Sequence, residues 1–372
     1  MSVKIAFDVS PLSGGHAVRG VGAYTKRLVQ ALEQESKRAR EQELKIDFVD
    51  FRHTTYNIQH TTYTVAHYPY FDLFFLTLPL RKPTKTIVTI HDVIPLVFPE
   101  HYPPGIKGKL KFQVQKFSLR SVDAVITDSQ NSKKDIVKYL SYPEEKIFVV
   151  YLAPAAIFKP ITNHQSLITI SKKYHLPQEF ILYVGDVNWN KNTPGLVKAC
   201  EKVKIPLVIV GKQAAEKNFD RSHPENQDLV WLQEKYQSSI INHKQSLLLR
   251  NQSSIFLTGF VPEEDLVKIY NLATVYCQPS FYEGFGLPVL EAMACGCPTV
   301  VAKTSSLPEI CGSVAIMVDP YREDDIAEGL DKVMQDQKTR DTLIKRGLVQ
   351  VKKFSWGKTA KGVVDVYKKV LS

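Results

Sequence analysis

The 372-residue sequence predicts an α/β protein with two Rossmann-like lobes, each built around a parallel sheet. Short apolar strands alternate with amphipathic helices along most of the chain, and this rhythm is typical of parallel sheets with right-handed crossovers. The rhythm pauses in a linker around 153–160 and restarts at Phe180. A chain of this length commonly forms two domains. We expect a first domain over 1–160, a second over 161–354 and a final helix over 355–372.

In the first half, the apolar runs predict strands at 4–9, 46–51, 64–67, 85–90, 124–127 and 147–151. The glycine-rich stretch Ser10–Gly22 reads as a loop before a helix at 23–35, a position where α/β proteins place ligand contacts. Gly20 and Gly22 are weak signals, because a plain flexible turn would look the same. The strand at 85–90 delivers His91 to its carboxyl end, where such sheets place reactive groups, which favours a functional role for this histidine.

The second half repeats the pattern. Strands are expected at 180–184, 206–210, 255–257, 274–278 and 299–302, and helices at 193–203, 263–272, 323–335, 338–353 and 357–371. The polar stretch 212–252 has little periodicity and predicts two helices with loops.

One stretch of the second half is suited to an anion flanked by hydroxyl groups. Gly284 and Gly286 permit backbone conformations closed to other residues, and Pro288 suits the first position of a helix. The amino end of that helix would offer free N–H groups and partial positive charge. Glu283 precedes the glycines, and Glu291 would lie in the first helical turn. A nucleotide sugar, with its sugar, diphosphate and ribose, has the matching shape.

Composition narrows the classes of partner. The formal charge of +10 favours an anionic partner such as a phosphate, a membrane surface or nucleic acid, although a solvated basic surface would account for it equally. The five cysteines lie in apolar stretches without a zinc-type pair, which predicts reduced and mostly buried thiols in a cytoplasmic protein. The chain starts directly with a strand, so we expect no signal peptide.

Two further stretches allow alternative readings. The aromatic segment 68–79 would suit a sugar, a lipid or a buried loop. Residues 104–122 predict a basic amphipathic helix. Such a helix can lie on an anionic membrane surface, and it can equally pack its apolar side inward. Peripheral contact with the inner face of the cell membrane therefore stays open.

These motifs together resemble the retaining glycosyltransferases of family 4, which have the two-lobed GT-B fold. The stretch 283–294 is similar to their donor-site motif. Further similarities lie in the phosphate loop at 184–192, the base-binding turn at 256–262, the first-lobe segments 89–95 and 128–129, and the segment 305–309. Many proteins of this group are mannosyl- or glucosyltransferases of bacterial surface polysaccharides. The resemblance implies transfer of such a hexose from a GDP- or UDP-linked donor to a glycan or lipid-linked acceptor, with retention of configuration. It also implies that the final helix packs back on the first domain.

The resemblance also assigns roles to residues. Glu283 would hold a hydroxyl of the donor sugar, His91 would contact that sugar from the first lobe, and Lys191 would stabilise the leaving phosphate. Further donor contacts would come from the residues Gly20, Gly22, Gly185, Asn190, Val261, Gly284, Phe285, Gly286, Leu287 and Glu291. Among these, Glu291 would bind the ribose and Val261 would lie against the base. No Asp-x-Asp motif is present, so we expect no metal and no other cofactor.

One departure from the family leaves a rival function open. Asn190 stands where the family usually has arginine, so Lys191, alone or with Lys212, would have to balance the diphosphate. The alternative is a catalytically weak or inactive member that binds a glycan or a partner. A hydrolase with Glu283 and Glu291 as its acid–base pair is disfavoured by the flanking glycines, and a nicotinamide enzyme by the missing G-x-G-x-x-G. Nucleic acid is not an expected partner.

Overall fold

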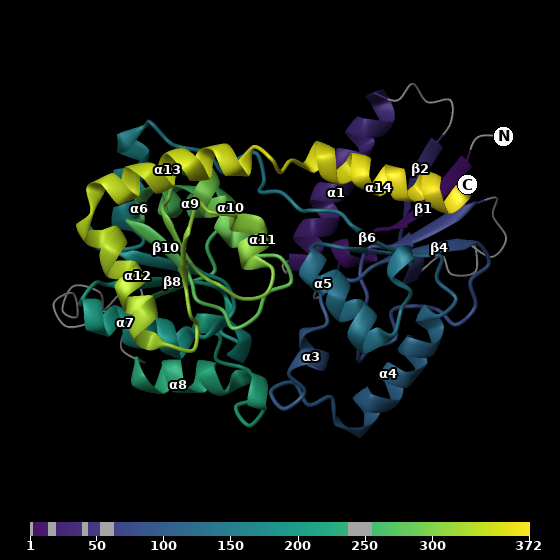
Figure 1. Ribbon diagram of the computed structural model, residues 1–372, viewed down its shortest axis with the longest axis horizontal. Helices are drawn as coiled ribbons and strands as arrows, with labels where there is room; N and C mark the ends of the chain where they lie inside the picture. Colours follow the sequence, from purple (N-terminus) through teal and green to yellow (C-terminus); the bar gives the residue numbers. More distant parts are fainter. Residues whose placement is uncertain (1–2, 14–19, 39–43, 53–62, 237–254) are drawn as a thin grey trace. The chain divides into compact units, whose positions relative to one another are not determined.

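The computed structural model describes residues 3–13, 20–38, 44–52, 63–236 and 255–372. They form two compact units (Figure 1). The first unit contains the chain up to Pro99, then Pro103–Ala153 and Phe354–Ser372; the second contains Glu100–Tyr102 and Pro154–Lys353. Both are parallel α/β units, which confirms the predicted fold class.

The boundary between the units lies earlier than the sequence suggested. Residues 154–160 belong to the second unit because they pack on one of its helices. The ring of Phe158 meets that of Tyr270 at 5.8 Å, and the Asn271 side chain donates to the carbonyl of Lys159 at 3.0 Å. The expected linker is therefore part of a folded unit.

The described residues of the first unit form a six-stranded parallel sheet in the order β2-β1-β3-β4-β5-β6. Its strands are β1 (Val3–Asp8), β2 (Leu44–Val49), β3 (Val65–Tyr68), β4 (Lys85–Thr89), β5 (Ala124–Thr127) and β6 (Ile147–Val149). Its helices are α1 (Gly20–Arg38), α3 (Ile94–Val97), α4 (Gly105–Leu119), α5 (Gln130–Asp135) with its extension Ile136–Leu140, and α14 (Trp356–Leu371).

Two features of the first unit bear on the predictions. The final helix α14 belongs to it, as expected, and packs against α1. Its Tyr367 hydroxyl lies 2.7 Å from Nδ1 of the buried His67 on β3. Helix α1 begins at Gly20, so the predicted loop extends too far: Gly20 and Gly22 lie in the first helical turn. Glycine read as a loop signal was misleading here, because neither residue has a positive φ.

The described residues of the second unit form another six-stranded parallel sheet, in the order β12-β11-β10-β7-β8-β9. Its strands are β7 (Ile181–Val184), β8 (Leu207–Val210), β9 (Ile255–Gly259), β10 (Val275–Gln278), β11 (Thr299–Ala302) and β12 (Ile316–Val318). Its helices are α6 (His164–Lys173), α7 (Thr193–Val203), α8 (Gln227–Lys235), α9 (Glu263–Leu272), α10 (Leu287–Ala294), α11 (Leu307–Cys311), α12 (Glu323–Gln335) and α13 (Gln337–Val351).

Helix α6 was not predicted. Asn163 caps it by accepting a hydrogen bond from the Ser166 N–H, and Leu167 and Ile170 are buried on its inner side. Of the two helices expected in 212–252, α8 is present, and the rest of that stretch lies largely outside the described residues. All five cysteines are buried free thiols, as predicted. No helix in the described part of the chain is long and apolar enough to span a bilayer.

Candidate functional site

The loop that joins β10 to α10 carries the motif singled out in the sequence. Gly286 precedes the helix with a φ of 101°, a value that strongly favours glycine. A Cβ there would lie 2.6 Å from a methyl carbon of Leu307. Helix α10 starts at Leu287, so Pro288 is its second residue. Glu291 lies in the second turn, one turn later than expected, because the helix begins before the proline.

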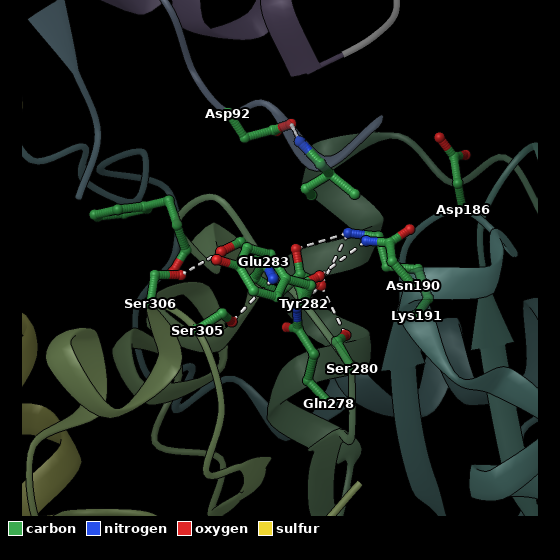
Figure 2. A network of polar contacts seen from close by, with 12 residues as sticks. Asp92, Asp186, Asn190, Lys191, Gln278, Ser280, Tyr282, Glu283, Ser305 and Ser306 are labelled. Carbon is green, nitrogen blue, oxygen red and sulfur yellow. Dashed lines mark hydrogen bonds and ion pairs between the residues drawn. The ribbon is translucent and has the colours of Figure 1, made fainter. Parts of the chain in front are cut away.

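Glu283 is buried and surrounded by donors. Its carboxylate accepts two hydrogen bonds from the Lys191 ammonium, 2.9 and 2.7 Å long. Gln278 Nε2 donates to Oε1 at 2.6 Å and Ser280 Oγ at 2.7 Å. Figure 2 shows these side chains converging on Glu283. Two uncharged donors, Gln278 and Ser280, thus share Oε1 of Glu283 with the lysine and stabilise the carboxylate of the ion pair.

The backbone of the loop is fixed by two serines that follow β11. Ser305 Oγ accepts from the Glu283 N–H at 2.9 Å. Ser306 Oγ donates to the carbonyls of Glu283 and Phe285 at 2.9 and 3.0 Å (Figure 2). A loop held from both sides keeps the carboxylate and the start of α10 in a constant arrangement.

Lys191 reaches Glu283 from the loop after β7. That loop begins at Gly185, and a Cβ on the neighbouring Gly211 would lie 2.1 Å from the Gly185 carbonyl oxygen. Asn190 is buried, and its side chain accepts from the Tyr102 hydroxyl at 2.7 Å and donates to the Tyr282 carbonyl at 2.9 Å. The asparagine that replaces the family's arginine thus ties this loop to the Glu283 loop.

Two sets of hydrogen bonds that support the phosphate loop were not predicted from the sequence. Gln213 accepts from the Val187 N–H at 2.5 Å and donates to the Asn188 side chain at 2.9 Å. Asn192 donates to the carbonyls of Pro279 and Pro320 at 3.1 and 2.7 Å. Their sequence neighbours give no signal of these roles, because the partners are distant in the chain. Gln278 and Ser280, in contrast, sit just before the motif and could have been identified by their position at the end of β10.

Glu291 lies further along α10 and is also buried. The Tyr270 hydroxyl of α9 donates to Oε2 at 3.3 Å. Burial, and secondarily the nearby Glu291 charge, raises the pKa of Tyr270 well above its usual value. The phenol therefore remains a donor to this carboxylate at neutral pH. Val261 is buried in the turn between β9 and α9.

In the first unit, His91 follows β4 and pairs with Asp128. Its Nδ1 lies 2.7 Å from Oδ2 of the buried carboxylate. Burial lowers the pKa of His91, but the Asp128 charge and hydrogen bond outweigh it, so the net pKa is raised. Ser129 caps helix α5, because its Oγ accepts from the Ser132 N–H at 3.0 Å. Asp128 instead orients the histidine.

Comparison with known proteins shows which protein family this chain belongs to. Residues 168–350 match the family model for glycosyl transferases group 1, and residues 38–153 match the model for glycosyltransferase family 4. The chain is 30% identical to the O-antigen chain mannosyltransferase B of Escherichia coli over 76% of its own length and 70% of the relative's. This chain belongs to the glycosyltransferases, with their two-lobed GT-B fold.

Two further likenesses agree with that assignment. The serotype-specific mannosyltransferase WbdA of Escherichia coli is 30% identical over 78% of this chain, which spans 34% of that longer protein. The Anabaena protein HepE, whose crystal structure holds UDP-glucose, superposes with a TM-score of 0.69 at 14% identity, covering 99% of this chain and all of its own. At that identity the likeness concerns the fold.

Proposed function

We propose that this protein transfers a mannose- or glucose-type hexosyl group from a GDP- or UDP-linked donor to a glycan or lipid-linked acceptor, with retention of configuration. The observation that carries the proposal is the ion pair of the buried Glu283 with the partly buried Lys191, beside the start of α10. A carboxylate suits sugar hydroxyls, and an ammonium group with a helix amino terminus suits a diphosphate. The names of the mannosyltransferase relatives support the hexose, and the UDP-glucose held by HepE supports a nucleotide donor.

The hydrogen bonds around Glu283 explain how one lysine could serve both groups. Breaking the bond between the anomeric carbon and the diphosphate builds negative charge on the leaving phosphate. In the proposal, the Lys191 ammonium, which has three N–H donors, donates at least one hydrogen bond to that phosphate. Gln278 and Ser280 continue to donate to Glu283, so the carboxylate stays satisfied. Retention follows the family resemblance, and so does the expected contact of His91 with the donor sugar.

Substitution of the pair tests the proposal. Transfer from GDP-mannose and UDP-glucose to a lipid-linked glycan would be measured for Glu283→Ala and Lys191→Ala. Loss of one charge-stabilising group typically lowers kcat by about 10²–10³-fold, so both variants should be nearly inactive. Lys198→Ala is the matched control, since Lys198 pairs with Glu323 on the surface of the same unit at 2.8 Å. Full activity in either site variant, with unchanged folding, would remove the site assignment.

The metal-free character of the reaction has its own test. We propose that Lys191 and the amino end of α10 supply the positive charge that other transferases take from a metal ion. Addition of EDTA should then leave the initial rate unchanged. Inhibition that a divalent cation reverses would refute this part of the proposal.

The rival function, a weak or inactive member that binds a glycan or partner, rests on Asn190. That residue has a structural use here, because its amide joins Tyr102 and Tyr282. The two functions are separated by calorimetric donor titration followed by a turnover assay on the same sample. Donor binding without transfer to any acceptor would support the rival.

A further inference from the structure

Helix α4 exposes most of its apolar side chains and buries two polar ones. Ile106, Leu110 and Phe117 are 82%, 65% and 63% exposed, whereas Gln115 and Ser118 on the opposite side are buried. A surface helix ordinarily shows the reverse arrangement, with its apolar stripe against the core. Inward packing, one of the two readings of the sequence, is therefore wrong for this stripe but correct for Leu119 and Phe112, which pack in or against the core.

Hydrogen bonds to the preceding loop explain the reversed arrangement. Gln115 Nε2 donates to Thr77 Oγ1 at 2.8 Å and to the Asp72 carbonyl at 3.1 Å, and its Oε1 accepts from the Leu78 N–H at 3.3 Å. Ser118 Oγ donates to the Pro79 carbonyl at 2.6 Å. These polar contacts dock the helix together with Leu119, which is buried in the core, and Phe112, which packs against that core. The apolar stripe with Ile106, Leu110 and Phe117 faces outward.

The loop held in this way adds more apolar surface. Phe75, Leu76 and Leu80 are 62%, 62% and 57% exposed. The Asp72 carboxylate fixes the turn by accepting from the Phe74 and Phe75 N–H groups at 2.7 and 2.9 Å. The side chain of Lys111 on α4 lies 4.7 Å from the centre of the Phe75 ring, so the loop and the helix share one surface.

This surface, called here the α4 face, is both apolar and basic. Its apolar members are Phe75, Leu76, Leu80, Ile106, Leu110, Val114 and Phe117. Its cations are Lys107, Lys109, Lys111 and Lys116, and the fifteen residues of α4 include no aspartate or glutamate. Exposed apolar patches of this kind mark interaction sites, and the charge requires an anionic partner.

We propose that the α4 face binds the surface of an anionic lipid bilayer. The apolar side chains would enter the boundary between headgroups and acyl chains, and the lysines would contact the headgroups, as in other basic amphipathic helices that lie on membranes. A second copy of this chain would bring the same positive charge and be repelled. The bilayer satisfies both properties of the face at once.

A pocket opens at the edge of the α4 face. It has a volume of about 550 Å³, shares Leu76, Leu80 and Val114 with the face, and reaches Asp8 and Tyr68 at the ends of β1 and β3. If the proposed transfer function holds, a lipid-linked acceptor in the same bilayer would arrive beside this pocket. Membrane binding itself needs no transfer, so the two proposals can fail separately.

Co-sedimentation of the full chain with lipid vesicles tests the proposal. Vesicles of phosphatidylglycerol and phosphatidylcholine should bind the protein at low salt, about 0.05 M, and release it as salt screens the charges. Removing a lysine near a membrane surface weakens binding about fivefold, so Lys107→Ser/Lys109→Ser should lose about 25-fold. Leu110→Ser/Phe117→Ser should lose more than about tenfold.

Matched controls separate the α4 face from general charge and apolarity. Lys361→Ser/Lys368→Ser removes two exposed lysines from α14, and Val349→Ser removes an exposed apolar side chain from α13. Both controls should bind as the unchanged protein does. Equal binding to pure phosphatidylcholine, no binding at low salt, or equal losses in the controls would overturn the proposal. A dimer on gel filtration that Leu110→Ser dissolves would assign the face to a second copy instead.

Discussion

Replacing Gly286 with alanine should destabilise the second unit strongly, for two reasons that can be separated. The residue has a φ of 101°, and holding alanine in such a region costs about 1–3 kcal/mol. The added Cβ would also lie 2.6 Å from Leu307 Cδ2. Leu307 is fully buried, so overpacking adds about 1–3 kcal/mol. The expected loss in the free energy of unfolding is about 2–6 kcal/mol.

A double-mutant cycle measured by urea unfolding divides this loss. Leu307→Ala alone should cost about 2–5 kcal/mol. In the Gly286→Ala/Leu307→Ala double variant the clash disappears while the strained φ remains. The losses of the two single variants should therefore sum to about 1–3 kcal/mol more than the loss measured for the double variant. Gly357→Ala is the control, because a Cβ there meets nothing within 4 Å. A Gly286→Ala protein within about 0.5 kcal/mol of the original stability, or strictly additive losses, would refute the reasoning.

Three other predictions concern single contacts. Burial, and then the charge of the nearby His91, lowers the pKa of His67 to about 3. As the pH falls below about 6.5, the His67 side chain is protonated in the unfolded chain but not in the folded protein. The free energy of unfolding should therefore decrease by at most about 1.4 kcal/mol per pH unit in this range. Urea unfolding at several pH values should show a smaller slope for His67→Gln, and an equal slope would contradict the assignment. Tyr102→Phe removes the 2.7 Å hydrogen bond to Asn190, a loss of about 1 kcal/mol. The KM for the donor should therefore rise about fivefold while kcat changes little. An unchanged KM would show that this contact does not position the loop that carries Lys191. Ser129→Ala should lower the free energy of unfolding by about 1 kcal/mol through loss of the helix cap. The same change at Ser166, whose exposed hydroxyl donates to the Asn163 carbonyl and accepts from no helix N–H, should lower it less; equal losses in urea unfolding would contradict the assignment of the cap.

The sequence was a good guide to the elements that depend on local pattern. Helices α7, α9 and α12 have the predicted bounds, because apolar periodicity and prolines or acids at their starts mark them. Helix α6 was missed because a short amphipathic segment after a proline-rich stretch resembles a linker. The start of α1 was misplaced because Gly20 and Gly22 were taken as breakers.

The site was predictable where its residues are close in sequence. Glu283 and the start of α10 follow from one motif, and Lys191 from a second. The pairing of His91 with Asp128 was not predicted, because it depends on two strands lying side by side at a particular register. The exposed apolar side of α4 could not be derived either, since it depends on hydrogen bonds between Gln115 and a loop about forty residues away.

The return of α14 to the first unit has a consequence for how the protein is made. The second unit's residues are complete at Lys353, but the first unit lacks a helix until α14 has been synthesised. At ordinary ribosomal speeds, synthesis of the residues after Ala153 takes roughly 10 to 40 s. During that interval His67 has no Tyr367 to bind, so the half that is synthesised first should be the last to reach its native state.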